Sequence, residues 1–159
     1  MSKKVATILI VEDDDVLFSK MAQTLIDEMA NQKTEFVIRR ASTLQDAHLS
    51  WQEHTPTAIS IDMQFPLLKG RYPDRTAGAQ LVYELMYLQN TQENAAFADK
   101  AVMYSGLSDI DIRILLKRNG VNERFFPPIL NKDPIYGHSA WAKKMMAVAI
   151  KHQPHIAHS

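Results

Sequence analysis

The sequence predicts an α/β protein whose parallel sheet is covered by helices on both faces, and three observations lead to this prediction. Five short apolar segments alternate with five segments whose apolar residues recur at helical spacing. Such alternation is typical of parallel strands joined by crossover helices. The 159 residues can form one domain with a real core, and no clear repeat is present. Right-handed crossovers leave few topologies, of which an open doubly wound sheet is the leading one.

The N-terminal half begins with an apolar run at residues 5–11 that is rich in β-branched residues and is followed by acids, as expected of a buried strand. Residues 16–29 carry Leu17, Met21 and Leu25 at helical spacing, which predicts a helix. The other predicted elements of this half are a strand at 35–39, a short helix at 44–51 and a strand at 57–61.

The C-terminal half continues the alternation, and Pro127 and Pro128 make its last strand suited to the edge of a sheet. Gly120 is well placed to end the helix that precedes this strand. The predicted elements are helices at 79–88, 110–117 and 139–151 and strands at 101–104 and 125–130. Two longer connections, at 65–76 and 90–99, separate elements within a domain of residues 1–151, and we expect residues 152–159 to be a frayed tail.

The composition excludes several classes of function. Lys and Arg total 18, as do Asp and Glu, so the chain lacks the basic footprint of a nucleic-acid-binding protein. The absence of cysteine excludes disulfides, iron–sulfur clusters, Cys-rich zinc sites and thiol nucleophiles. No apolar run approaches the ~20 residues of a membrane span, and no secretory signal is recognisable. We therefore expect a cytoplasmic protein that binds neither nucleic acid nor a membrane.

Polar and charged residues follow four of the predicted strands. They are Glu12 and Asp13 after the first strand, Asp62 after the third, Ser105 and Gly106 after the fourth, and Lys132 after the fifth. Ligands of open α/β sheets bind outside the carboxyl ends of the strands, and these four ends converge if the strands lie side by side. Carboxylates held together raise one another's pKa, and Mg²⁺ offsets that repulsion. The residues therefore suit an anion held on or beside a carboxylate.

Other uses of such a sheet fit the sequence less well. A nucleotide or flavin site needs a Gly- or Ser/Thr-rich loop after the first strand, where this chain has four consecutive acids. These acids include Asp14 and Asp15, which we assign to a helix N-terminus rather than to the site. An aspartyl-nucleophile phosphatase would have a second Asp two residues after Asp62, where Gln64 stands. A metal-dependent phosphohydrolase would need a second acid that activates the nucleophile, and no such acid is recognisable in this sequence.

Four motifs resemble those of the receiver domain of bacterial two-component response regulators. Residues 8–14 are similar to the family's first strand and acidic pair, and residues 62–66 resemble its Asp-x-x-Met-Pro motif, with Gly70 as the motif's glycine. Residues 103–106 resemble the end of its fourth strand, and Lys132 resembles its lysine. The resemblance runs from about residue 5 to residue 150.

The resemblance implies a flavodoxin-like sheet of strand order 2-1-3-4-5 with five helices, and it implies the roles of the site residues. Asp62 would accept a phosphoryl group from a histidine kinase or a phosphotransfer protein. Mg²⁺ would be held by Glu12 (through water), Asp13, Asp62 and the Gln64 carbonyl, and the phosphoryl group by Ser105, Gly106 and Lys132. The chain would be a stand-alone response regulator, not an enzyme beyond its own phosphorylation and dephosphorylation, that signals through protein contact or a phosphorelay. The alternative is a receiver-like interaction module that is not phosphorylated.

Three departures from the family pattern concern the output more than the metal site. Asp133 separates Lys132 from the proline that usually follows the lysine, and the family's aromatic switch position falls near Ile129. The connection at 65–76 is similar to an insertion and carries the cations Lys69, Arg71 and Arg75. It is a candidate partner-binding loop, or else a solvated loop. Family members often dimerise through the face between the fourth strand and the last helix, so a homodimer through this face is a further expectation.

Overall fold

The computed structural model describes residues 5–88, 94–133, 135 and 137–153, and its central feature is a five-stranded sheet. All four strand pairings are parallel, and the strand order is β2-β1-β3-β4-β5. The strands are β1 (Val5–Val11), β2 (Glu35–Ala41), β3 (Ala58–Ile61), β4 (Ala101–Ser105) and β5 (Ile129–Asn131). The order confirms the predicted topology and places the carboxyl ends of β1, β3, β4 and β5 side by side.

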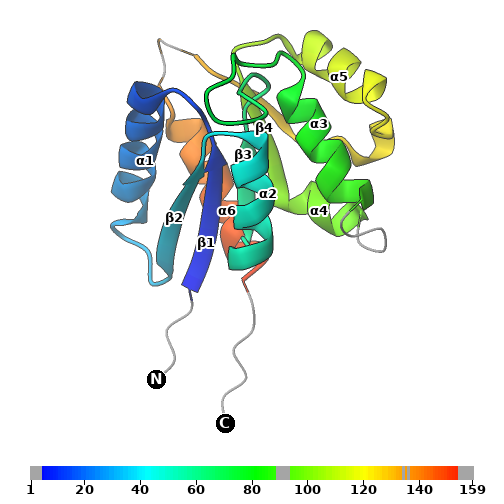
Figure 1. Cartoon of the computed structure of the whole chain (residues 1–159). Coiled ribbons are helices and arrows are strands. Elements are labelled where there is room, and N and C mark those ends of the chain that lie inside the picture. Colours follow the sequence, from blue (N-terminus) through cyan, green and yellow to red (C-terminus); the bar gives the residue numbers. More distant parts are fainter. Residues whose placement is uncertain (1–4, 89–93, 134, 136, 154–159) are drawn as a thin grey trace.

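Helices cover both faces of the sheet, as predicted (Figure 1). On one face lie α1 (Asp15–Met29) and α6 (Ser139–Lys151), and on the other lie α2 (Leu44–His54), α3 (Ala77–Tyr83), α4 (Asn94–Lys100) and α5 (Asp109–Arg118). The side chains of β1 alternate between the two cores: Ile8 and Ile10 pack towards α1 and α6, whereas Leu9 and Val11 pack towards α2 and α3. Burial on both faces explains the nearly continuous apolar run of this strand.

The prediction of five helices is wrong, because the described residues contain six α-helices. The additional helix is α4, in a stretch at 90–99 that we expected to be a polar connection; residues 90–93 of this stretch lie outside the described part of the chain. Phe97 and Ala98 anchor α4 in the core, although the surrounding residues lack a clear helical pattern. The helix predicted at 79–88 begins two residues earlier and continues after Tyr83 as a π-helix, η1 (Glu84–Leu88).

The fifth strand is shorter than predicted. Phe125 belongs to a 3₁₀ turn, η2 (Glu123–Phe125), and pairing with β4 begins only at Ile129. Proline has no N–H to give to a sheet ladder, so Pro127 and Pro128 delay the strand. The Pro128 carbonyl still accepts a hydrogen bond from the Met103 amide at 2.9 Å, which guides the chain into register.

The predicted insertion at 65–76 forms a loop that rises above the carboxyl end of the sheet (Figure 1). An antiparallel bridge between Phe65 and Asp74 closes its base, where the Asp74 amide donates to the Phe65 carbonyl at 3.0 Å. The Pro66 carbonyl accepts a further bond from the Leu44 amide at the start of α2. These contacts hold the base of the loop beside the sheet and leave its tip exposed.

The glycine that the fold requires after β3 is Gly78, so the assignment of that place to Gly70 is wrong. The Gly78 amide donates to the Met63 carbonyl at 2.9 Å, and a β-carbon added to Gly78 would lie 2.2 Å from the Asp62 carbonyl oxygen. Gly70 instead has a φ of +81° in the inserted loop and open space around it.

We expect the Gly78→Ala variant to lose about 1–3 kcal/mol of unfolding free energy, because the added methyl group forces the backbone at Asp62 to shift. Urea denaturation followed by circular dichroism measures the loss. Gly106→Ala is the matched control, because a β-carbon there meets nothing within 4 Å. Equal stability of the two variants would contradict the close approach at Gly78.

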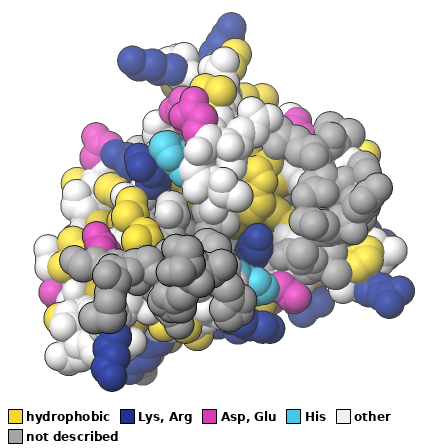
Figure 2. All heavy atoms as spheres, turned by 90° about the horizontal axis from the view of Figure 1, so that it is seen from below, with side chains coloured by type: hydrophobic (Ala, Val, Ile, Leu, Met, Phe, Trp, Pro, Cys, Tyr) yellow, Lys and Arg dark blue, Asp and Glu magenta, His cyan; other side chains and the backbone are white. Residues whose placement is uncertain are grey.

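No helix in the described part of the chain is long and apolar enough to cross a membrane. Figure 2 views the molecule from below and shows basic and acidic side chains interspersed among the described residues of that face. This distribution agrees with the balanced composition.

Candidate functional site

Three acidic side chains meet at the carboxyl end of the sheet. Glu12 and Asp13 directly follow β1, and Asp62 directly follows β3. One carboxylate oxygen from each lies within 4.8 Å of the others. They line a hollow of about 330 Å³ together with the other predicted site residues Gln64, Ser105, Gly106 and Lys132. The structure therefore brings together the residues predicted to hold the metal and the phosphoryl group, from four separate strand ends.

Lys132 partly neutralises these acids. Its Nζ lies 2.7 Å from Glu12 Oε1 and 3.1 Å from Asp62 Oδ2. All three side chains are largely buried, with exposures of 16% for Lys132, 2% for Glu12 and 13% for Asp62. The Lys132 amide donates to the Ser105 carbonyl at 2.9 Å, so the pairing of β5 with β4 fixes the backbone from which the lysine reaches the acids.

The charges of the pocket remain unbalanced despite the lysine. Burial raises the pKa of Asp62 to about 6, and the nearby Glu12 carboxylate adds to this rise, while Lys132 opposes it. Burial, with the Glu12 charge second, also raises the pKa of Asp13. Carboxylates that are costly to ionise are stabilised by a bound cation or by a proton. The pocket is thus suited to a divalent cation, for which oxygen ligands are preferred.

We expect the Mg²⁺ affinity to fall as the pH is lowered through about 6, because protons then compete for Asp62. The raised pKa also means that the metal-free fold binds this proton more tightly than the unfolded chain does. The stability that protonation of Asp62 gives to the metal-free fold is therefore present at acidic pH and is lost as the pH rises towards and beyond 6. Calorimetric Mg²⁺ titration at about pH 5 and about pH 7.5 measures the effect, and equal affinities would contradict it.

The loop between β1 and α1 is held by Arg40, a residue that the sequence analysis did not select. Its guanidinium donates to the Glu12 carbonyl at 3.1 Å and to the Asp13 carbonyl at 3.2 Å. It also pairs with Asp15 Oδ1 at 2.7 Å. Asp14 caps α1 by accepting from the Leu17 amide at 2.9 Å, which confirms that Asp14 serves the helix N-terminus. Arg40 comes from β2, and nothing in its local sequence indicates this partner.

The end of β4 supplies a buried hydroxyl group. Ser105 is 2% exposed, and its Oγ accepts from the Leu107 amide at 3.2 Å. This bond leaves the hydroxyl proton for an acceptor in the pocket. Asn131 Nδ2 donates to the Leu107 carbonyl at 2.6 Å and ties this loop to β5. Ser105 and Lys132 therefore present donors to the same space as Asp62.

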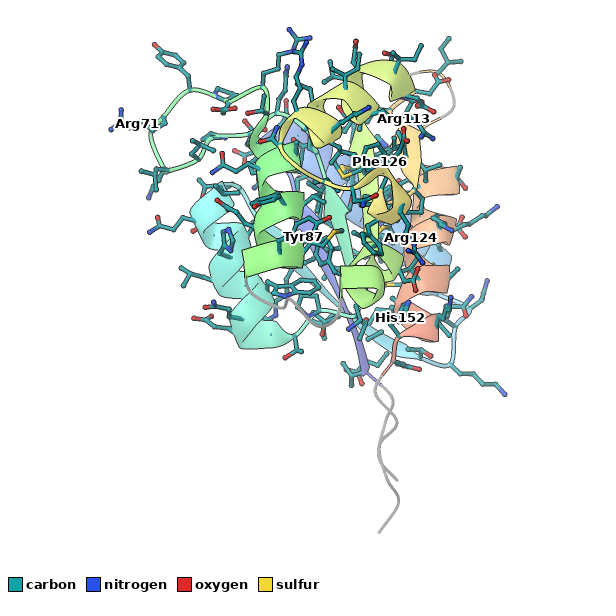
Figure 3. All side chains as sticks on the ribbon, turned by 90° about the vertical axis from the view of Figure 1, so that its right-hand side faces the viewer. Arg71, Tyr87, Arg113, Arg124, Phe126 and His152 are labelled. Carbon is teal, nitrogen blue, oxygen red and sulfur yellow. The ribbon has the colours of Figure 1, made fainter. Side chains whose placement is uncertain are left out.

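Four residues of the prediction lie apart from this pocket. Lys69, Arg71 and Arg75 are exposed on the loop at 65–76, of which Pro73 lines the pocket, and Figure 3 shows Arg71 at the outer part of that loop. Ile129 is half-buried at the start of β5 and packs against the core. The partner-binding role of the loop and the switch role of Ile129 stay predictions.

An aromatic cluster beside Lys132 was missed by the sequence analysis. Tyr104, at the residue before Ser105, points to the opposite face of β4, and Lys132 Nζ lies 5.8 Å from its ring centroid. The ring stacks on Trp141 at 5.3 Å, and Trp141 Nε1 donates to the buried Ser60 hydroxyl at 2.9 Å. The Tyr104 hydroxyl is hydrogen-bonded to His138 Nδ1.

The protonation states in this cluster follow from its burial. Burial raises the pKa of Tyr104 to about 12, so its phenol keeps the proton. Burial and the charges of Lys132 and Lys20 lower the pKa of His138, so its imidazole is neutral at pH 7. The imidazole tautomer decides which of the Tyr104 hydroxyl and His138 Nδ1 is the donor of their hydrogen bond. The cluster links the pocket lysine to the packing between the sheet and α6.

The fold matches solved response regulators. A two-component response regulator from Legionella pneumophila is 15% identical with a TM-score of 0.59, covering 92% of this chain and 98% of that chain. The receiver domain of NtrX from Brucella abortus is 21% identical with a TM-score of 0.54, covering 91% and 96% respectively. The Mn²⁺-bound form of response regulator Rcp1 is 18% identical with a TM-score of 0.54, covering 98% and 99%.

No protein-family model matches the sequence, and no curated protein does. These three matches span nearly the whole of each solved chain, so the similarity covers a complete domain. The chain has the flavodoxin-like fold of response-regulator receiver domains.

Proposed function

We propose that this chain is a response-regulator receiver that accepts a phosphoryl group on Asp62 from a histidine kinase or a phosphotransfer protein. The observation that carries the proposal is the convergence of three carboxylates and one lysine in a single pocket at the carboxyl end of a receiver-fold sheet. The reaction needs an oxygen nucleophile, positive charge around the transferred group and hydrogen-bond donors to its oxygens. Asp62, Lys132 and Ser105 supply these functions.

The donor set fits Mg²⁺. Asp13 and Asp62 would bind the ion directly, with the Gln64 carbonyl as a third protein ligand and Glu12 acting through water. Mg²⁺ favours a few carboxylates and retains waters, which leaves positions for phosphoryl oxygens. The related fold of Rcp1 was solved with Mn²⁺ bound, which supports a divalent cation for this fold. The bound ion would supply charge that offsets the negative oxygens of the transferred group.

The proposed transfer makes one bond and breaks one bond. A carboxylate oxygen of Asp62 attacks the phosphorus of a phosphohistidine, so that a P–O bond forms as the P–N bond breaks. The imidazole leaves with the electron pair of the broken bond and takes up a proton from solvent. Lys132 exchanges its ion pair with Asp62 for a contact with the phosphoryl oxygens, and the Ser105 hydroxyl donates to another oxygen.

The surface around the pocket supports a protein as the phosphoryl donor. Large apolar side chains are exposed on the segments that follow all four strand ends around the pocket: Val16, Leu68, Tyr72, Ile110 and Ile135. Tyr72 is 94% exposed and Ile135 is 83% exposed. Exposed apolar residues gathered around a polar site are typical of a protein-binding surface. Lys69, Arg71 and Arg75 would extend this surface towards an acidic partner.

The output follows from the same proposal. The phosphorylated chain would signal by contact with a further protein or pass the phosphoryl group on in a relay, in the cytoplasm, with no catalytic activity beyond its own phosphorylation and dephosphorylation. The alternative is an interaction module that is not phosphorylated. The substitution of Asp133 for the usual proline and the aliphatic residue Ile129 at the switch position favour this alternative.

We expect the Asp13→Asn variant to bind Mg²⁺ at least about tenfold more weakly, because it removes a charged ligand from the pocket. Calorimetric titration measures the affinity. Asp27→Asn is the matched control, because Asp27 is exposed on α1, does not line the pocket and accepts a side-chain hydrogen bond from Gln23. Unchanged Mg²⁺ binding by the Asp13 variant would remove this residue from the metal site.

A further inference from the structure

A second and larger hollow lies away from the acidic pocket. It measures about 550 Å³ and is enclosed by α4, α5, η2, the segment before β5, and α6. Its lining includes Asp99, just before β4, and Pro127 and Pro128, just before β5, so it opens near the amino ends of these strands. The phosphoacceptor pocket lies at their carboxyl ends, and the two hollows share no lining residue among those described.

Four cations surround this hollow: Arg113 from α5, Arg124 from η2, and Lys144 and Lys151 from α6. None of them forms an ion pair within the described residues. Two acids, Asp99 and Glu123, also line it, so its charged residues carry a net positive charge. Lys144 and Lys151 are two helical turns apart on α6, so their backbone positions are separated by roughly 10 Å along the helix axis.

Part of the lining is apolar and carries ring surfaces. Phe126, Pro127 and Pro128 follow η2 directly, and Ile129 and Val148 are the other large apolar residues of the lining. Phe126 is half-buried and lies between Arg113 and Arg124 in the view of Figure 3. A flat ring can stack on such surfaces, and guanidinium groups stack on rings as well.

We propose that this hollow binds a small, multiply charged anion that carries a flat ring, the chemistry of a nucleoside polyphosphate. The volume is in the range of small-molecule sites. Lys144 and Lys151 would bind the phosphates, and the ring would stack beside Phe126. Asp99 and Glu123 would accept hydrogen bonds from amino or hydroxyl groups of the nucleoside. These hydrogen bonds would give a role to the two carboxylates in a lining that is basic overall.

Two other occupants fit the hollow less well. A two-fold dimer through this face would bring the same patch of each copy together, and its two acids could pair with only two of the four cations of the other copy. A peptide cannot extend the sheet over much of this edge, because β5 has three residues and the two preceding prolines lack an N–H. An acidic peptide bound through side chains alone would meet Asp99 and Glu123 unfavourably.

Calorimetric titration with ATP in the presence of EDTA tests the proposal, because EDTA prevents binding through a metal at the acidic pocket. Tripolyphosphate and an acidic Glu-rich peptide are the comparison ligands. We expect ATP to bind the intact chain more tightly than either of them. The Asp62→Asn variant should bind ATP equally well, so this test is independent of the phosphoacceptor assignment.

The charge-reversed double variant Lys144→Glu, Lys151→Glu should lose at least about tenfold in ATP affinity, since charge-assisted hydrogen bonds are replaced by repulsion. The matched control is Lys117→Glu, Lys143→Glu, which makes the same change in net charge at exposed positions of α5 and α6 outside the hollow. Circular dichroism checks that both variants fold. Absence of ATP binding, equal losses in both variants, or tighter binding of tripolyphosphate or peptide than of ATP would overturn the proposal.

Discussion

The Asp62→Asn variant is expected to take up no phosphoryl group from acetyl phosphate and Mg²⁺, whereas the unaltered chain takes up one. An amide cannot form the acyl phosphate, and the structure places Asp62 in the pocket with its Oδ2 3.1 Å from Lys132 Nζ. Intact-mass spectrometry measures the uptake. The variant should remain folded, because burial raises the pKa of Asp62 to about 6 and the amide therefore removes a charge that is costly at neutral pH.

The control for this prediction is Asp109→Asn, which removes an exposed carboxylate from the first turn of α5. It should be phosphorylated like the unaltered chain. Phosphoryl uptake by the Asp62 variant at the same level would assign the acceptor to another residue. Failure of both variants and of the unaltered chain would instead favour the interaction module that is not phosphorylated.

The Lys132→Met variant is expected to lose about 3–5 kcal/mol of unfolding free energy in EDTA, because removal of one partner leaves buried charges without compensation. The uncompensated groups are Glu12 and Asp62, and Mg²⁺ can replace the missing positive charge. We therefore expect Mg²⁺ to restore much of the loss. Urea denaturation in EDTA and in Mg²⁺ measures both effects.

Lys143→Met is the matched control for the lysine variant, since Lys143 is exposed on α6 and lines neither hollow. It should change stability little in either buffer. A loss for Lys132→Met no larger than that of the control would show that the lysine does not balance the acids. A large loss that Mg²⁺ leaves unchanged would place the metal elsewhere than beside Glu12 and Asp62.

The sheet and the acidic site could be predicted because both depend on local sequence patterns. The apolar run of β1 ends directly in Glu12 and Asp13, and the third apolar run ends at Asp62. Parallel topology then places these ends at one edge, so side-chain proximity follows from strand order alone. The same reasoning placed Ser105 and Lys132 correctly.

Features that depend on tertiary contacts could not be predicted in the same way. Arg40 holds the loop of Glu12 and Asp13, but it comes from β2, and its partners are known only once the strands are paired. Tyr104 and His138 are far apart in sequence, and their contact depends on how α6 packs. Their role beside Lys132 has no local sequence signal.

The other wrong predictions concern the glycine after β3, the start of β5 and the helix α4, and each has a cause in the local sequence. The inserted loop carries its own glycine, Gly70, which drew the assignment away from Gly78, although only Gly78 lies against the Asp62 backbone. Pro127 and Pro128 belong to an apolar stretch that resembles a strand, but they cannot donate to its ladder. The short helix α4 is anchored by Phe97 and Ala98 in a mostly polar segment, so its periodicity is weak.

The most direct test of the proposed function is to locate the phosphoryl group on the chain. The protein is incubated with acetyl phosphate in Mg²⁺ or EDTA, the acyl phosphate is reduced with borohydride, and the digested peptides are analysed by mass spectrometry. We predict a single reduced aspartate, at residue 62, formed in Mg²⁺ and absent in EDTA. A reduced aspartate at another position, or no modification in Mg²⁺, would contradict Asp62 as the phosphoacceptor of this receiver fold.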